Sequence, residues 1–265
     1  MTEEVELPWG LPLRVRPAEV IGRAIWTTGV YDLAVSEVLW RLSDPGETAV
    51  DAGANIGYMT SLLAARVGPS GVVYAYEPHA GVFAELLANV GLWEGRRSAR
   101  LRTRQVGLSD SARDAVLVEG PEFERNRGTA RVADAAPDAA RIQLTTLDQE
   151  IGPDVRIGVL KVDVEGHEAP LLRGAHRLLA ARAVRDVVYE ELSGEESAAT
   201  SVLRSHRYSV FRILKRVVGP VLARGASRGR FDAFTAQSYL ATAEPERAVA
   251  RLKSRGWRCL RSGAQ

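Results

Sequence analysis

The sequence is short of cysteine, of long apolar runs and of linker-like segments. Its 265 residues contain one cysteine, Cys259, which excludes an internal disulfide and any zinc or iron–sulfur site built from several cysteines. No run of about 18 apolar residues is present, so no membrane span is predicted. The opening stretch MTEEVELPWG is acidic and lacks the apolar core of a signal peptide. We therefore expect a soluble, cytoplasmic protein.

Lysine is also scarce, and the basic charge is unevenly spread. Only 3 of the 35 basic residues are lysines, and residues 201–265 hold 14 Lys and Arg against 3 Asp and Glu. A basic segment of this kind is typical of proteins that bind anions or nucleic acid. Arginines scattered over solvated faces give the same composition, and we favour that interpretation. No aromatic stacking run accompanies the arginines, which disfavours single-stranded nucleic acid as a partner.

What the sequence does contain is a regular alternation of apolar strands and helices. Strands are predicted at 48–52, 72–76, 101–106, 157–162, 184–189, 208–214 and 231–240, and helices at 31–42, 58–66, 80–92, 169–181, 195–205 and 244–256. This alternation predicts a doubly wound α/β fold, in which helices cover both faces of a mostly parallel sheet.

The length and the 46% hydrophobic content suit one sizeable core. We expect the first 30 residues to be irregular with short strands, and 215–230 to form a loop rich in Arg and Gly. Residues 1–47 are interpreted as an irregular and helical cover for cofactor and substrate. The main domain is assigned to 48–240, with an insertion at about 110–150, and a helical tail to 241–265.

A glycine-rich turn follows the first buried strand, in the segment VDAGANIGY (Val50 to Tyr58). Ligands of such sheets bind beyond the carboxyl ends of the strands, where Asp51, Gly53, Asn55 and Gly57 are expected to lie. Glycines let the backbone approach a ligand closely, and the N-terminus of the next helix suits the carboxylate of a methionine-like group. Asp51 can receive an ammonium group directly or through water. The spacing does not fit the G-x-G-x-x-G fingerprint of dinucleotide sites, nor is a phosphate loop present.

The second strand ends in an acidic residue, Glu77, which lies 20 residues after Gly57. An acid at this place can accept hydrogen bonds from both hydroxyls of an adenosine ribose. Leu108 and Ser109 follow the third strand and are expected to contact the adenine. Strand, turn, helix, strand and acid together indicate a nucleoside-containing cofactor.

A second group of acids follows the strand at 157–162, in the run LKVDVEGHE (Leu160 to Glu168). Asp163 and His167 belong to this run, and the neighbouring strand ends in Glu190 and Glu191. In a parallel sheet both strand ends face the same crevice, so these side chains are expected where ligands bind.

With both acidic strand ends identified, the sequence resembles the FkbM family of methyltransferases. The resemblance spans roughly residues 28–240 and is carried by VDAGANIGYMT (50–60), YEP (76–78), Asn89, GLSD (107–110), TTLD (145–148), LKVDVEGHEAPLLRGA (160–175) and the strand end at Glu190. Gly29-Val30-Tyr31-Asp32 is similar to a family G-x-[YF]-E element, with Asp in place of Glu.

The resemblance implies a class I methyltransferase fold with a seven-stranded mixed sheet and S-adenosylmethionine as the methyl donor. It also implies a hydroxyl acceptor on a sugar, a glycan or a natural-product scaffold, as in antibiotic biosynthesis. The cofactor-binding residues that we expect are Tyr31, Asp51, Gly53, Asn55, Gly57, Glu77, Pro78, Leu108, Ser109 and Asp163.

Methyl transfer to an aliphatic hydroxyl needs a base, and the sequence offers several candidates. His167 is the first, because its ordinary pKa of about 6.5 suits proton uptake near neutral pH; a solvent-facing histidine at a helix start is the alternative. Asp163 is the second candidate, as the base or as the residue that orients His167, and Glu190 lies beside it. Asp163 and Glu190 also admit a Mg²⁺ site, since some enzymes of this class use such an ion.

Three other functions compete with this prediction. A methyltransferase acting on nucleic acid or another nitrogen would favour an Asn/Asp-Pro-Pro-aromatic loop after the fourth strand, where this chain has DVEGHE. A nicotinamide-dependent oxidoreductase lacks its fingerprint here. A non-catalytic module that only binds S-adenosylmethionine is the third alternative. The arginines of the loop Arg224 to Arg230 hint at an anionic or sugar-phosphate acceptor.

Overall fold

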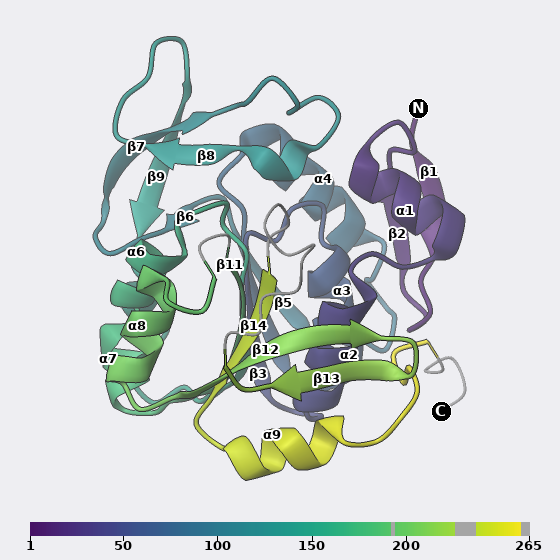
Figure 1. Cartoon of the computed structure of the whole chain (residues 1–265). Coiled ribbons are helices and arrows are strands. Elements are labelled where there is room, and N and C mark those ends of the chain that lie inside the picture. Colours follow the sequence, from purple (N-terminus) through teal and green to yellow (C-terminus); the bar gives the residue numbers. More distant parts are fainter. Residues whose placement is uncertain (192–193, 226–236, 261–265) are drawn as a thin grey trace.

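The computed structural model describes residues 1–191, 194–225 and 237–260. Within these residues the centre of the molecule is an eight-stranded sheet in the order β13-β12-β14-β11-β10-β3-β4-β5 (Figure 1). The strands, in this order, are Gly219–Ala223, Ser209–Arg216, Gln237–Thr242, Val184–Glu191, Ile157–Val162, Thr48–Ala52, Val72–Tyr76 and Arg100–Arg104.

The five strands from β11 to β5 are parallel to one another, whereas β14 is antiparallel to both β11 and β12. The central strand β10 is buried at all six positions, as expected for an apolar strand covered on both faces. The prediction of a doubly wound, mostly parallel α/β sheet is therefore confirmed.

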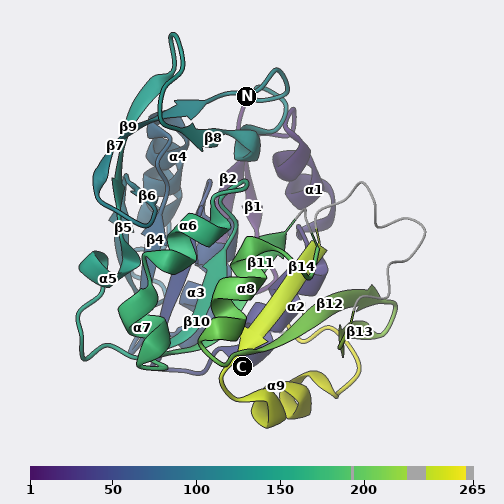
Figure 2. The same ribbon diagram turned by 60° about the vertical axis from the view of Figure 1, so that its left-hand side comes forward.

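Helices cover the two faces of this sheet, as Figures 1 and 2 show. One face carries α2 (Leu33–Leu42), α3 (Tyr58–Val67) and α4 (Ala80–Gly91), whose apolar side chains belong to one buried cluster together with strand residues such as Val159. The other face carries α6 (Glu168–Arg173), α7 (His176–Ala180) and α8 (Ala198–Ser205), packed in a second cluster that includes Leu160. Successive residues of β10 thus serve opposite cores, as the alternation of side chains along a strand requires.

The insertion forms a separate four-stranded sheet in the order β6-β9-β7-β8. Its strands are Gly107–Leu108, Ala140–Thr145, Arg113–Val118 and Arg131–Ala133, and the short helices η1 (Arg127–Thr129) and α5 (Leu147–Glu150) flank it. Figure 1 places this sheet at the end of the molecule opposite helix α9 (Pro245–Leu252).

The N-terminal residues are more regular than the sequence analysis expected. Strands β1 (Glu3–Glu6) and β2 (Pro12–Val15) form a hairpin, and α1 (Val20–Thr28) follows. This helix was missed because only Gly22 and Ile25 in it are buried, so its apolar periodicity is weak. Asp32, in a left-handed conformation, then caps α2 by accepting a hydrogen bond from the backbone of Val35.

Two further expectations need correction. The loop expected at 215–230 holds most of the hairpin between β12 and β13, which adds an eighth strand to the seven expected; the remainder of that loop and residues 231–236 of the last strand lie outside the described residues. The helix expected at 169–181 is broken into α6 and α7 at Gly174. A Cβ at Gly174 would lie 1.8 Å from the carbonyl oxygen of Ser109, so close packing against the insertion requires glycine there.

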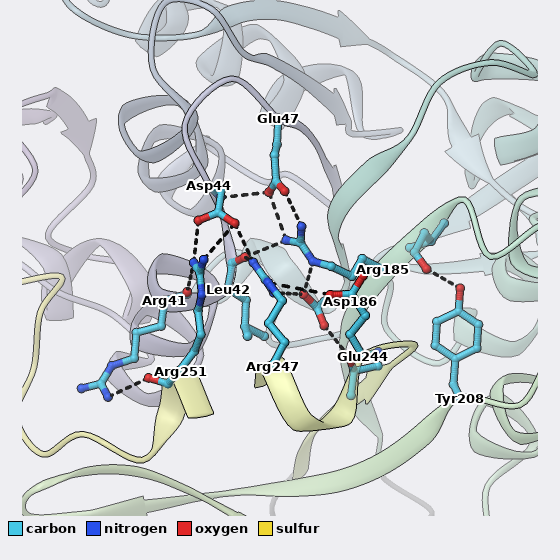
Figure 3. A network of polar contacts seen from close by, with 12 residues as sticks. Arg41, Leu42, Asp44, Glu47, Arg185, Asp186, Tyr208, Glu244, Arg247 and Arg251 are labelled. Carbon is cyan, nitrogen blue, oxygen red and sulfur yellow. Dashed lines mark hydrogen bonds and ion pairs between the residues drawn. The ribbon is translucent and has the colours of Figure 1, made fainter. Parts of the chain in front are cut away.

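The amino ends of the strands carry a dense network of ion pairs (Figure 3). Arg247 and Arg251 of α9 pair with Asp44, which precedes β3. Arg185, at the start of β11, pairs with Glu47 and with the buried Asp186, which also accepts from Arg247. The network fastens the C-terminal helix to the sheet. Each of its carboxylates has an arginine partner.

Candidate active site

A pocket of about 1370 Å³, which includes open solvent at its mouth, lies at the carboxyl ends of the parallel strands. Residues from three parts of the chain line it. The strand ends contribute Gly53, Ala54, Asn55, Glu77, Pro78, Leu108, Asp163, Glu165, His167 and Glu190; the N-terminal segment contributes Ile21, Tyr31, Asp32 and Val35; and the insertion contributes Leu117, Asn126, Arg127, Gly128, Ala130 and Val132. The crevice expected from the two acidic strand ends is therefore present as a single pocket.

The turn after β3 is held by two close contacts. Gly53 has a φ of +75°, and a Cβ there would lie 1.9 Å from the carbonyl oxygen of Asp163, so the turn packs directly against the end of β10. Gly57 has a φ of +97° and precedes α3, where a Cβ would lie 2.8 Å from Leu86. Gly53 and Asn55 line the pocket, whereas Gly57 is absent from its lining and serves the packing of α3.

Glu77 lies at the end of β4 with its side chain against the turn. Its carboxylate accepts hydrogen bonds from the backbone N–H groups of Asn55, at 3.0 Å, and His79, at 2.9 Å. Burial raises the pKa of Glu77, while these two hydrogen bonds oppose the rise. Each carboxylate oxygen retains a lone pair, so Glu77 can still accept from ligand hydroxyls. His79, by contrast, is absent from the pocket lining and its ring contacts Glu119.

A buried lysine, which the sequence analysis did not assign to the site, lies under the turn. Lys161 Nζ donates to the carbonyl oxygen of Gly53 at 2.8 Å and lies 3.2 Å from Asp51 Oδ1 and 3.6 Å from Asp163 Oδ2. Burial alone would lower the pKa of Lys161, but Asp51 and Asp163 outweigh it and the pKa is raised. In the sequence, Lys161 stands out as a single lysine in an otherwise apolar strand.

Asp51 itself lies behind the pocket wall. It is fully buried and absent from the lining, and its Oδ2 accepts a hydrogen bond from Thr60 at 2.6 Å. The expectation that Asp51 receives an ammonium group, directly or through water, stays a prediction. Asp51 acts on the pocket through Lys161.

Four carboxyl groups gather on one side of the pocket. Burial, and then the charge of and a hydrogen bond with Asp163, raise the pKa of Glu190 to about 8. Burial followed by the charges of Asp163 and Glu168 raises the pKa of Glu165 to about 7. Burial also raises the pKa of Asp32, and Asp163 adds to that rise. Asp163 thus lies at the centre of a group of acids, and Lys161 is the cation that contacts it.

The structure does not support the expected Mg²⁺ site at Asp163 and Glu190. Among residues 1–191, 194–225 and 237–260, no group of three or more His, Cys, Asp or Glu side chains is arranged to hold a metal ion. The physical reason is the ammonium group of Lys161, which already supplies a positive charge beside Asp163.

His167 lines the pocket, and its ring contacts Ser109 rather than the carboxyl groups around Asp163. Its Nε2 lies 2.9 Å from Ser109 Oγ, to which Arg113 also donates at 3.3 Å. Burial, followed by the charge of Arg113, lowers the pKa of His167. Ser109 is fully buried and absent from the pocket lining, so it supports His167 rather than facing a ligand. Leu108 does line the pocket, as expected.

Two segments cover the pocket: the N-terminal segment, which the sequence predicted as a cover, and the insertion, for which no such role was predicted. Tyr31 lines the pocket, its backbone N–H donates to Tyr58 Oη at 2.9 Å, and burial followed by Asp163 raises its pKa to about 12. Arg127 of the insertion pairs with Glu19, at 2.9 Å, and with Glu85, at 2.7 Å. This arginine fastens the insertion to both the N-terminal segment and α4, and so fixes the roof of the pocket.

Comparison with known families gives one match over this core. Residues 51–210 match the family model described as the methyltransferase FkbM domain. The chain is 30% identical to "Methyltransferase sdnD" of Sordaria araneosa, over 74% of this chain and 83% of that protein. It is 28% identical to "AMB antimetabolite synthetase AmbE" of Pseudomonas aeruginosa, over 78% of this chain but only 11% of that much longer protein.

Solved structures give more distant likenesses. An S-adenosylmethionine-dependent O-methyltransferase from Thermotoga maritima superposes with a TM-score of 0.45 and 17% identity, over 83% of this chain and 69% of that one. Magnesium protoporphyrin IX methyltransferase from Synechocystis gives a TM-score of 0.45 and 13% identity, over 84% and 83%. In the described part of the chain, no helix is both long enough and apolar enough to span a membrane.

Proposed function

Because the chain belongs to the FkbM family of S-adenosylmethionine-dependent methyltransferases, we propose that it methylates a hydroxyl oxygen of a small molecule. The acceptor that we propose is a sugar or a natural-product scaffold. One observation carries the proposal: the turn after β3 and the carboxyl pair Asp163–Glu190 share one covered pocket. That pocket provides a cofactor side and a proton-accepting side next to each other.

The residues on the cofactor side fit an adenosine-containing methyl donor. Glu77, with lone pairs free beside its two backbone hydrogen bonds, would accept from the ribose hydroxyls. Pro78 and Leu108 would provide apolar contacts to the adenine. The turn at Gly53 and Asn55, with the N-terminus of α3, would hold the carboxylate of the methionine part. When bound, the donor supplies an electrophilic methyl group on sulfur.

The carboxyl pair is the proposed base for the acceptor hydroxyl. Asp163 lies 3.6 Å from the ammonium of Lys161, and Glu190 holds the proton of the pair near neutral pH. Asp163 would therefore take the hydroxyl proton as the oxygen attacks the methyl group. A positioned base of this kind contributes about 10²–10⁴-fold to a rate.

His167 becomes the second candidate for the base. Its Nε2 contacts Ser109, which follows Leu108 on the proposed adenine side, and its lowered pKa leaves it neutral but weakly basic. We propose that His167 borders the cofactor and that the acidic pair borders the acceptor. Tyr31 and Asp32, which line the same side as the pair, would then contact the acceptor.

The covering segments favour a small acceptor. The N-terminal segment and the insertion both line the pocket and are joined by Arg127, which restricts access and excludes water from the reaction. The name of one relative, an antimetabolite synthetase, supports a natural-product context. The hint of an anionic acceptor rested on Arg224 to Arg230, of which 226–230 lie outside the described residues.

The test is a methyl-transfer assay with matched acceptors. Hydroxylated sugars and glycosylated metabolites are incubated with S-adenosylmethionine beside their deoxy or already O-methylated counterparts, and products are identified by mass spectrometry. We expect methylation only where the free hydroxyl is present. Transfer to the deoxy counterparts, or to a short RNA instead, would contradict the proposal. A parallel series with EDTA measures any dependence on a divalent ion.

A further inference from the structure

We propose that Lys161 is a positioning residue for methyl transfer, whose ammonium group joins the cofactor turn at Gly53 to the base at Asp163. The role of Asp163 in this inference rests on the function proposed above, whereas the role at Gly53 concerns cofactor binding alone. Lys161, which itself lines the pocket, is therefore assigned an action on both of its halves.

Lys161 lies one residue before the end of β10 and is only 5% exposed. Its Nζ lies close to three groups: the Gly53 carbonyl, Asp51 and Asp163. Nζ donates to the Gly53 carbonyl at 2.8 Å and forms ion pairs with the two carboxylates. Gly53 and Asp163 line the pocket, as Lys161 itself does.

The bond to Gly53 determines the shape of the turn. The carbonyl of Gly53 and the N–H of Ala54 belong to one planar peptide unit. Lys161 holds the carbonyl at 2.8 Å, and the carbonyl oxygen of Tyr76 accepts from the Ala54 N–H at 2.9 Å. This peptide is thus fixed at both ends, directly before Asn55, whose N–H donates to Glu77. Loss of the ammonium group would free the carbonyl end of the peptide unit that leads to the proposed ribose site.

Lys161 also supplies a positive charge between two carboxylates. Asp51 is fully buried and Asp163 is half-exposed at the pocket, and Lys161 is the cation that contacts both. Without it, neither carboxylate would keep this cation, and Thr60 would remain as a hydrogen-bond donor to Asp51. Asp163 would lose the ion pair that holds it at the pocket.

The experiment compares Lys161→Met with a variant that removes a buried cation elsewhere. Arg185→Met removes a cation that pairs with Glu47 and Asp186 at the opposite ends of the strands. Both variants are expected to lower the melting temperature. Only Lys161→Met should weaken binding of S-adenosylmethionine and S-adenosylhomocysteine in calorimetry, by about 10-fold or more for a lost charge-assisted hydrogen bond. The exposed lysine variant Lys253→Met is a control for the chemical change itself.

A double variant, Asp51→Asn with Lys161→Met, addresses the case in which Lys161→Met alone does not fold. It removes the buried charge pair together, so that folding is preserved while the Gly53 carbonyl still loses its partner. We expect its cofactor affinity to remain reduced by about 10-fold. Folded Lys161→Met or double variants with wild-type cofactor affinity would overturn the proposal, as would an equal loss of affinity in Arg185→Met.

Measurement of turnover separates the effect of Lys161 on Gly53 from its effect on Asp163. With an acceptor in hand, Asp163→Asn should lower kcat and leave cofactor affinity unchanged, whereas Lys161→Met should alter both. Because the binding measurement needs no acceptor, failure to find a hydroxyl acceptor would contradict the proposed function without changing the result for Gly53. Unchanged kcat in the folded double variant would contradict the link to Asp163.

Discussion

The two ends of the central sheet use charged residues in opposite ways. At the amino ends, Asp44, Glu47 and Asp186 each contact an arginine (Figure 3). Burial raises the pKa of Asp186, although Thr242 and Arg185 oppose the rise. At Asp44, hydrogen bonds from Arg251 and Arg247 outweigh burial and lower the pKa. At the carboxyl ends, burial and the charge of Asp163 raise the pKa of Glu190 to about 8.

This difference separates stability from function. Carboxylates that are matched by cations stabilise the folded state, whereas carboxyl groups crowded beside one another are held at a cost in stability. Perturbed groups of this kind gather at functional sites. The comparison therefore predicts that substitutions at the amino ends change stability and leave ligand binding intact, and that substitutions at the carboxyl ends change binding or turnover.

The largest effect is expected from the proposed base. Asp163→Asn should lower kcat by about 10²–10⁴-fold, because it removes the group that accepts the hydroxyl proton. Cofactor affinity, measured by calorimetry, should stay close to that of the wild type. His167→Gln is the matched comparison at the other side of the pocket. A larger loss of turnover in His167→Gln than in Asp163→Asn would return His167 to first place.

The next effect tests the amino ends. Arg247→Met removes hydrogen bonds to Asp186, to Asp44 and to the carbonyl of Leu42. It should lower the free energy of unfolding by about 1–3 kcal/mol, because Arg185 and Arg251 still donate to these acceptors. Denaturant titration measures this change. Cofactor affinity of the folded variant should be unaffected. A large loss of affinity would show that the two ends are not independent.

A smaller effect is expected at Glu77, the acid proposed to contact the ribose. Glu77→Ala removes the carboxylate that contacts Asn55 and His79, and should weaken S-adenosylmethionine binding by about 10–100-fold for charge-assisted hydrogen bonds. Glu94→Ala, at an exposed position after α4 and outside the pocket lining, is a control. Equal affinity in Glu77→Ala and the wild type would place the cofactor elsewhere.

The smallest effect concerns pH and stability. The pKa of Glu190, about 8 in the folded protein, lies above its unfolded value of about 4.3. The folded state therefore holds an extra proton between these values, and the free energy of unfolding falls as the pH rises through this window. Glu190→Gln should raise the melting temperature above pH 8, by a few degrees. The gain should disappear near pH 4; a gain of the same size at both pH values would contradict this account.

Much of the fold was predictable because it rests on local patterns. The apolar runs at 72–76 and 157–162 and the turn at Gly53 predicted the parallel sheet and its ligand edge. The β12–β13 hairpin was not predictable, since Val217 and Val218 at its tip are exposed and nothing in the alternation marks β13. The break between α6 and α7 depends on the contact of Gly174 with Ser109, which lies 65 residues away in sequence.

The site was predicted in its residues but less well in their roles. Glu77, Asp163 and Glu190 all line the pocket, because strand ends meet at one edge of the sheet. Asp51 and Ser109 lie behind its wall, and depth beneath a surface depends on tertiary packing. Lys161 was overlooked because its importance comes from three partners that only the folded chain brings together.

The most direct test of the account is the chemical identity of the transferred methyl group. The protein is incubated with S-adenosylmethionine labelled with ¹³C in the methyl group and a hydroxylated sugar or natural-product acceptor, and the product is analysed by carbon NMR. The account predicts a labelled methyl group on oxygen, formed by the wild type and lost with Asp163→Asn. A labelled methyl group on nitrogen or carbon, or undiminished formation by Asp163→Asn, would contradict it.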